Sequence, residues 1–105
     1  MSLNLGINAS GQLTTTQQTL YQTTPTQSAS VKISLVNTTT STIKVNIWLK
    51  NGTSTARLIS PKDLELQGKH KHVICYHELG ASDSIEGKAT VGSQVDYSIT
   101  GFVKT

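Results

Sequence analysis

The chain has 105 residues, a formal net charge of +3 and a charged fraction of only 14%, and Thr (16) and Ser (12) are abundant. This length fits one domain, and its scattered basic residues do not form the aromatic-lined basic patch that nucleic-acid binding uses. No apolar run is long enough to span a membrane and the N-terminus lacks signal-peptide features, so we expect folding in a cytoplasm without a membrane partner.

Residues 1–28 differ from the rest of the chain because polar Thr and Gln tracts dominate them. Leu3, Leu5 and Ile7 alternate with polar or small residues, which is enough for one short strand, and the segment around Tyr21 allows another. Tracts this polar bury too little surface to become ordered alone. We therefore expect an extended N-terminal arm over 1–28, flexible in a free monomer. In an assembly, it would become ordered by adding a strand to a neighbouring subunit.

Residues 29–105 contain short alternating apolar runs separated by Gly, Asn, Ser and Thr. The clearest run is 43–49, whose odd-numbered apolar residues share one strand face. Asn51-Gly52 follows it, and this pair favours a type I′ hairpin turn. The whole region predicts about seven or eight strands with turns every eight to twelve residues. We therefore expect an all-β fold, an antiparallel β-sandwich of the Ig-like or jelly-roll kind.

Trp48 lies on the opposite, nominally polar face of the 43–49 strand. A large aromatic side chain there indicates that this face is covered, either by the arm or by a partner. The candidate partner contacts are therefore the apolar residues of the arm and this tryptophan: Leu3, Leu5, Ile7, Tyr21 and Trp48. For each of them, packing in the chain's own core is an equally good explanation.

The histidines form the only grouping with metal-ligand potential. His70 and His72 would project from one strand face, whereas His77 has the opposite parity unless a bulge intervenes. Lys69 and Lys71 would repel a cation. An exposed edge strand, whose charged side chains discourage aggregation, explains the same run of Lys and His residues. We therefore expect no metal site, leaving open whether His70 and His72 bind a metal in an oligomer.

The remaining polar residues do not predict catalysis. Asp63 and Glu65 would share one strand face, which the solvent side of a strand explains without the carboxylate pair of a glycosidase. The single Cys75 lies in an apolar stretch, and we expect it to be a small buried hydrophobic residue. No glycine loop precedes a helix to hold a phosphate. We expect no enzyme activity, no catalytic residues and no cofactor.

Several segments from Leu20 onward follow one order of strands and turns: Leu20-Tyr21, Thr24-Pro25-Thr26, residues 31–40, Leu64-Glu65-Leu66, residues 79–85 and residues 95–101. In this order they resemble the small β-sandwich virion structural proteins of tailed bacteriophages. The resemblance covers about four-fifths of the chain. The sequence departs from the pattern where Ala81-Ser82 separates Gly80 from Asp83, and at Lys69-His70-Lys71-His72.

This resemblance implies an architectural role without catalytic residues. Within this class we favour a capsid decoration (cement) protein that binds and stabilises the shell, because a compact domain with an ordering arm suits clamping neighbouring shell subunits. The partners would be other virion proteins (the major capsid protein, or tail or neck proteins) and further copies of the chain in a homo-oligomer. The protein would be located in the virion, which would be assembled in the host cytoplasm. The alternatives are a neck, tail or baseplate structural protein, and a sugar- or receptor-binding module of the tail.

Overall fold

The computed structural model describes residues 4–104, apart from the side chains of Asn4, Leu5, Cys75 and Tyr76. Within this range every regular element is a β-strand, which confirms the expected all-β class. The strands are β1 (Asn4–Gln12), β2 (Gln18–Gln22), β3 (Ser28–Asn37), β4 (Ile43–Lys50), β5 (Arg57–Leu58), β6 (Leu64–Leu66), β7 (Lys71–Leu79), β8 (Ser84–Ala89) and β9 (Val95–Lys104).

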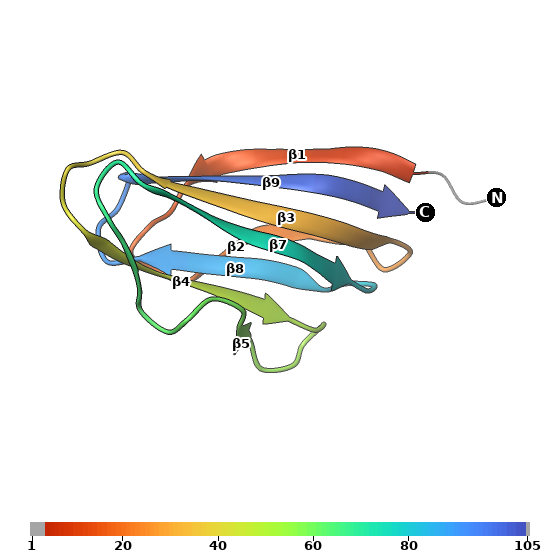
Figure 1. Cartoon of the computed structure of the whole chain (residues 1–105). Helices are drawn as coiled ribbons and strands as arrows, with labels where there is room; N and C mark the ends of the chain where they lie inside the picture. Colours follow the sequence, from red (N-terminus) through yellow and green to blue (C-terminus); the bar gives the residue numbers. More distant parts are fainter. Residues whose placement is uncertain (1–3, 105) are drawn as a thin grey trace.

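The strands form two antiparallel sheets that pack face to face (Figure 1). Sheet A has the order β1-β9-β3-β7, and sheet B has the order β2-β8-β4-β5, with β6 pairing with another part of β4. The pairs are nested along the chain: β4 with β5 and β6, β3 with β7, β2 with β8, and β1 with β9. A long antiparallel hairpin rolled across itself gives this nesting, so the sandwich is a jelly roll rather than an Ig-like fold.

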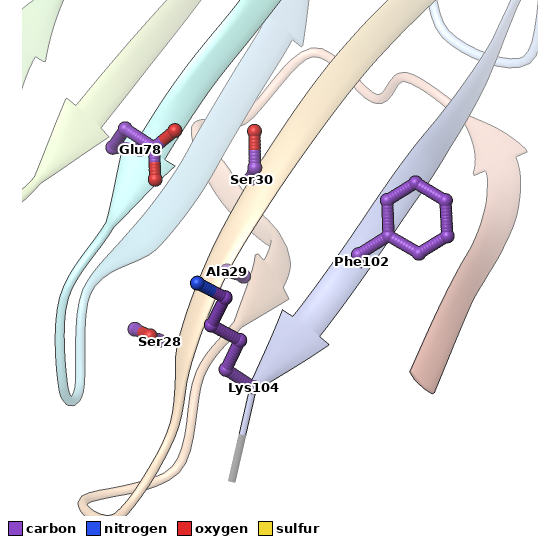
Figure 2. Close-up of a pocket in the computed structure, with 6 residues that line it drawn as sticks. All are labelled: Ser28, Ala29, Ser30, Glu78, Phe102 and Lys104. Carbon is purple, nitrogen blue, oxygen red and sulfur yellow. The ribbon is translucent and has the colours of Figure 1, made fainter. Parts of the chain in front are cut away.

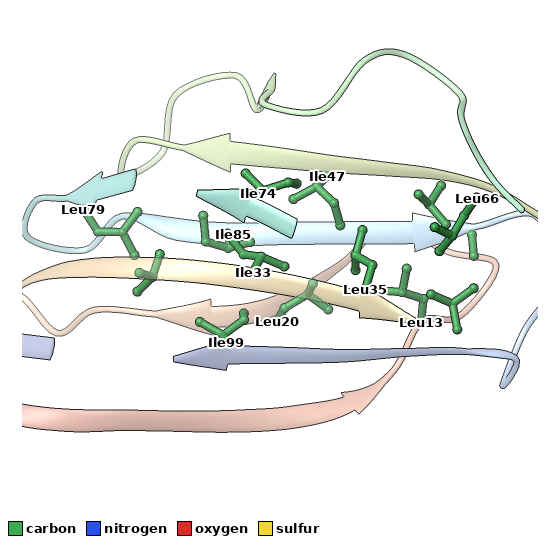
Figure 3. Close-up of a cluster of buried hydrophobic side chains, with 14 of the residues drawn as sticks. Leu13, Leu20, Ile33, Leu35, Ile47, Leu66, Ile74, Leu79, Ile85 and Ile99 are labelled. Carbon is green, nitrogen blue, oxygen red and sulfur yellow. The ribbon is translucent and has the colours of Figure 1, made fainter. Parts of the chain in front are cut away.

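The core lies between the two sheets and consists of the inward side chains of both (Figure 3). The alternation expected from the sequence is present in β3, where Val31, Ile33 and Leu35 are fully buried. In β4, Val45 and Ile47 are fully buried opposite them, in sheet B. Period-two patterning therefore fixes which face of each central strand points inward.

The N-terminal residues belong to the sandwich, where we expected an arm. β1 pairs with β9 without a register shift from Asn4↔Lys104 to Gln12↔Asp96. Leu13, at the crossing between the sheets, is 0% exposed, and Leu20 in β2 is 8% exposed. A boundary at residue 28 therefore does not separate two structural units. The prediction failed because β8 and β9 provide backbone partners and apolar contacts, so a few leucines are enough to order a polar segment.

A β-bulge explains how the sparse apolar residues of β2 are used. The β2–β8 register shifts between Thr19 and Tyr21, so Leu20 is the additional residue. Leu20 is buried, and Tyr21 pairs with the fully buried Ile85. Because a bulge places two residues opposite one, consecutive Leu20 and Tyr21 both contribute to the core.

The Asn51-Gly52 pair forms a turn of a different type from the expected one. Gly52 has a φ of +57°, and the Ser54 amide donates to the Asn51 carbonyl at 2.9 Å. Positive φ at the first central position alone defines a type II′ turn rather than type I′. The Asp83 carboxylate accepts from the Asn51 side chain (3.0 Å) and from the Gly52 amide (3.2 Å), which fixes this geometry.

Candidate interaction surface

The three histidines do not converge on one point. An additional residue in β7, opposite the Val31–Ile33 segment of β3, gives His77 the same parity as His72. These two histidines pair with Val31 and Leu35, four residues apart, so about 13 Å of strand separates them. Among the described residues, no group of three or more His, Cys, Asp and Glu could hold a metal ion.

The described part of the chain also has no helix long and apolar enough to cross a membrane.

Asp83 is the one buried acid among the described residues, and its bonds are structural. Besides Asn51 and Gly52, its carboxylate accepts from the Gly80 amide at 2.7 Å. The Asp83 amide donates to the Thr23 hydroxyl at 3.0 Å. Asp83 therefore ties three loops together at one end of the sandwich: its carboxylate joins the β4–β5 and β7–β8 loops, and its amide reaches the β2–β3 loop. Sequence reasoning missed it, although an Asp that follows a Gly-containing loop is a local signal for such a turn.

The outward face of sheet A is broad and carries mostly short side chains. In one row across β1, β9, β3 and β7, Ser10, Ser98, Ser34 and Val73 lie side by side. We call this surface the sheet A face. Its members on the described strands are Gly6, Asn8, Ser10, Gln12, Ser28, Ser30, Lys32, Ser34, Val36, Lys71, Val73, Glu78, Asp96, Ser98, Thr100, Phe102 and Lys104.

Three large apolar side chains of the sheet A face are exposed: Phe102 at 60%, Val73 at 38% and Val36 at 37%. The cross-strand neighbours of Phe102 are Gly6 in β1 and Ser30 in β3, which are too small to cover an aromatic ring. Figure 2 shows the ring on the β1 side of β9. The three share one face of sheet A, but Phe102 lies opposite Ser30 and Val36 lies six residues further along β3, about 20 Å away, so they do not form one contiguous apolar patch.

An open hollow lies beside Phe102 (Figure 2). Ser28, Ser30, Glu78 and Lys104 line it together with the ring, and the two charged groups come from β7 and β9. One carboxylate, one ammonium group and an aromatic ring across two serines suit contacts with another protein surface.

Of the predicted partner contacts in the N-terminal segment, some lie outside the described residues and others pack against the chain's own core. Leu3 and the side chain of Leu5 lie outside the described residues. Ile7 and Tyr21 are partly buried and pack against the chain's own core. Burial raises the pKa of the Tyr21 hydroxyl above its ordinary value of 10.0. Core packing therefore already uses much of the apolar surface of Ile7 and Tyr21.

Trp48 lies on the outward face of sheet B, half-buried between Leu58 of β5 and Glu86 of β8. Part of this face is covered by the chain itself, where we expected the arm or a partner. Asn46, two residues before Trp48, is 7% exposed, and its side-chain amide donates to Asp63 at 3.0 Å. The segment between β5 and β6 provides this cover. The structure leaves Trp48 and the neighbouring Leu58, 40% exposed, accessible at the surface.

The comparisons with known proteins support the fold. No protein-family model matches the sequence, and no curated protein is a significant match. Among solved structures, the chain is similar to one from the structure of infectious bursal disease virus Gx strain. The TM-score is 0.56 and the identity is 13%, and the match covers 99% of this chain and 32% of the viral chain. The chain thus spans about a third of the length of that viral chain, and the likeness defines the class of fold shared by the two.

Proposed function

We propose that this chain is a virion structural protein, and specifically a capsid decoration protein of a tailed phage that binds and stabilises the shell. The observation that carries the proposal is the rolled sandwich, which matches a chain of a virus structure over 99% of this chain. The pattern of strands and turns from Leu20 onward, resembling tailed-phage virion proteins, supports the finer assignment.

The proposed docking surface is the sheet A face. Its short Ser and Thr side chains leave a flat sheet against which a second protein can pack closely. Phe102, Val73 and Val36 provide exposed apolar area whose burial contributes to binding, about 1.5–3 kcal/mol for a full aromatic or aliphatic side chain. On a particle, many copies on a symmetric lattice would multiply this modest contribution.

A binding assay with particles tests the proposal. Particles assembled without this protein are mixed with the purified chain and sedimented, and the bound fraction is measured over a concentration series. We expect saturable binding by the wild-type chain and at least about tenfold weaker binding by Phe102→Ser, since tenfold equals about 1.4 kcal/mol. Val91→Ser is the matched control, because Val91 is 46% exposed but lies between β8 and β9, away from the sheet A face.

The outcomes separate the possible roles. Binding to empty shells, with a higher temperature of shell disruption, supports the decoration role, whereas binding confined to tails or necks supports the neck, tail or baseplate alternative. Failure to bind any particle component contradicts the proposal. A glycan array tests the sugar-binding alternative, which rests on the accessible Trp48. If the chain binds a saccharide and Trp48→Ala abolishes this binding, the sugar-binding alternative is supported and the architectural role is contradicted.

A further inference from the structure

The open sheet edges of the described structure differ in how well they are protected. An exposed edge is a template for another strand, and natural proteins blunt it with charge, bulges or short length. In sheet B, β5 has 2 residues, β6 has 3, and β2 has 5 with a register shift. In sheet A, β7 is bulged and carries Lys71 and Glu78. Each of these edges therefore has at least one protective feature.

β1 has none of these features. It has 9 residues, NLGINASGQ, with neither charge nor proline, and its pairing with β9 runs without a register shift. No described strand pairs with its other side. Gly6 has no side chain, and the space beside it is open, since a Cβ built there meets nothing within 4 Å. β1 is thus the long, flat, uncharged edge of the molecule.

The free backbone groups of β1 can be assigned from the ladder. The Leu13 amide, directly after β1, donates to the Val95 carbonyl at 2.9 Å. Because backbone groups of successive residues point to opposite sides of a strand, the odd-numbered residues of β1 face β9. The amides and carbonyls of Gly6, Asn8, Ser10 and Gln12 therefore point to the open edge.

This edge is complementary to a second copy of itself. An antiparallel pair of β1 strands with a twofold axis at Asn8 overlaps the whole strand and places the free backbone groups of Gly6 opposite those of Ser10. On the inner face, the same register places Ile7 of one copy opposite Ala9 of the other. On the outer face, only uncharged polar side chains and glycine meet. Self-pairing therefore brings no like charges together.

We infer that two copies of this chain pair through antiparallel β1 strands, which joins their four-stranded sheets A into one continuous sheet. Phe102 provides a second reason for this location. Its 60% exposed ring is separated from the β1 edge only by Gly6, so a strand added there lies close to the ring. The inference does not depend on the role in a particle.

Sedimentation equilibrium of the purified full chain tests the pairing, in a concentration series up to about 1 mM. We expect the wild-type chain to reach twice its mass of 11.3 kDa. Asn8→Lys places two ammonium groups opposite each other at the axis, and Asn8→Pro removes a free edge amide without removing a bond to β9. Both variants are expected to raise the dimer dissociation constant at least tenfold while leaving the melting temperature of the monomer nearly unchanged.

Ser34→Lys is the matched control, because it adds the same charge to the sheet A face on the central strand β3. Retained dimerisation in Ser34→Lys, with loss in Asn8→Lys, supports the inference. A wild-type chain that stays monomeric over the whole range overturns it, as do a dimeric Asn8→Lys variant and equal losses in Ser34→Lys and Asn8→Lys. If the Asn8→Pro variant does not fold, the comparison of dimerisation between Asn8→Lys and Ser34→Lys still tests the inference. Since particles are not used, failure here is distinguishable from failure of the proposed function.

Discussion

Replacing Leu13 by alanine should destabilise the whole domain, because its side chain is part of the core. Leu13 is 0% exposed, and a Cβ built on Gly87 of β8 would lie 3.2 Å from its Cδ2 atom, so it packs directly against sheet B. Removing three side-chain carbons, one methine and two methyls, costs about 2.4 kcal/mol at about 0.8 kcal/mol per carbon. The cavity left behind raises the expected loss in the free energy of unfolding to about 3 kcal/mol.

Urea unfolding followed by far-UV circular dichroism measures this loss. With an m-value of about 1.5 kcal/mol per molar, a loss of about 3 kcal/mol lowers the midpoint by about 2 M. Leu58→Ala is the matched control, since the same truncation at a side chain 40% exposed should cost less than about 1 kcal/mol. A Leu13→Ala variant within about 0.5 kcal/mol of the wild type would refute the placement of the N-terminal segment in the core.

Three further predictions concern the loops, the packing of β8 and the pH dependence. Asp83→Ala removes a carboxylate that accepts three hydrogen bonds, and we expect the free energy of unfolding, measured in urea, to fall by about 3 kcal/mol. The control is Asp96→Ala at an exposed position, which should lower it by less than about 0.5 kcal/mol. Gly87→Val should cost about 1–3 kcal/mol by overpacking, because even a Cβ there lies 2.9 Å from Leu20 Cδ1; a neutral effect in thermal melts would contradict this packing. Burial raises the pKa of Tyr21, so the folded state holds this proton more tightly than the unfolded state. The free energy of unfolding should therefore fall as the pH rises above about 10, and Tyr21→Phe should lose less stability than the wild type between about pH 9 and 11; equal losses would show that Tyr21 is not responsible.

The central strands could be predicted from the sequence because their signal is local. Alternation in 31–35 and 43–49 specifies both the strand and its inward face, and the structure has β3 and β4 there. The rolled topology could not be predicted in the same way, since β1 and β9 pair across almost the whole chain. The sequence pattern therefore left Ig-like and jelly-roll arrangements open.

The errors at the N-terminus have the same physical origin. Leu13 and Leu20 are isolated in polar sequence, and their burial depends on Gly87, a strand residue whose missing side chain makes room for them. No local pattern connects residues so far apart. Phe102 was likewise not singled out, because only its pairing with Gly6 and Ser30 shows that its neighbours leave it uncovered.

The copy number of the chain in purified particles tests the proposed virion role most directly. Quantitative mass spectrometry with isotope-labelled peptides, on particles purified through successive density gradients, gives the molar ratio to the major shell protein. A structural protein of the shell should show a fixed ratio that stays constant through each purification step. A ratio that falls toward zero as purification proceeds would contradict the account.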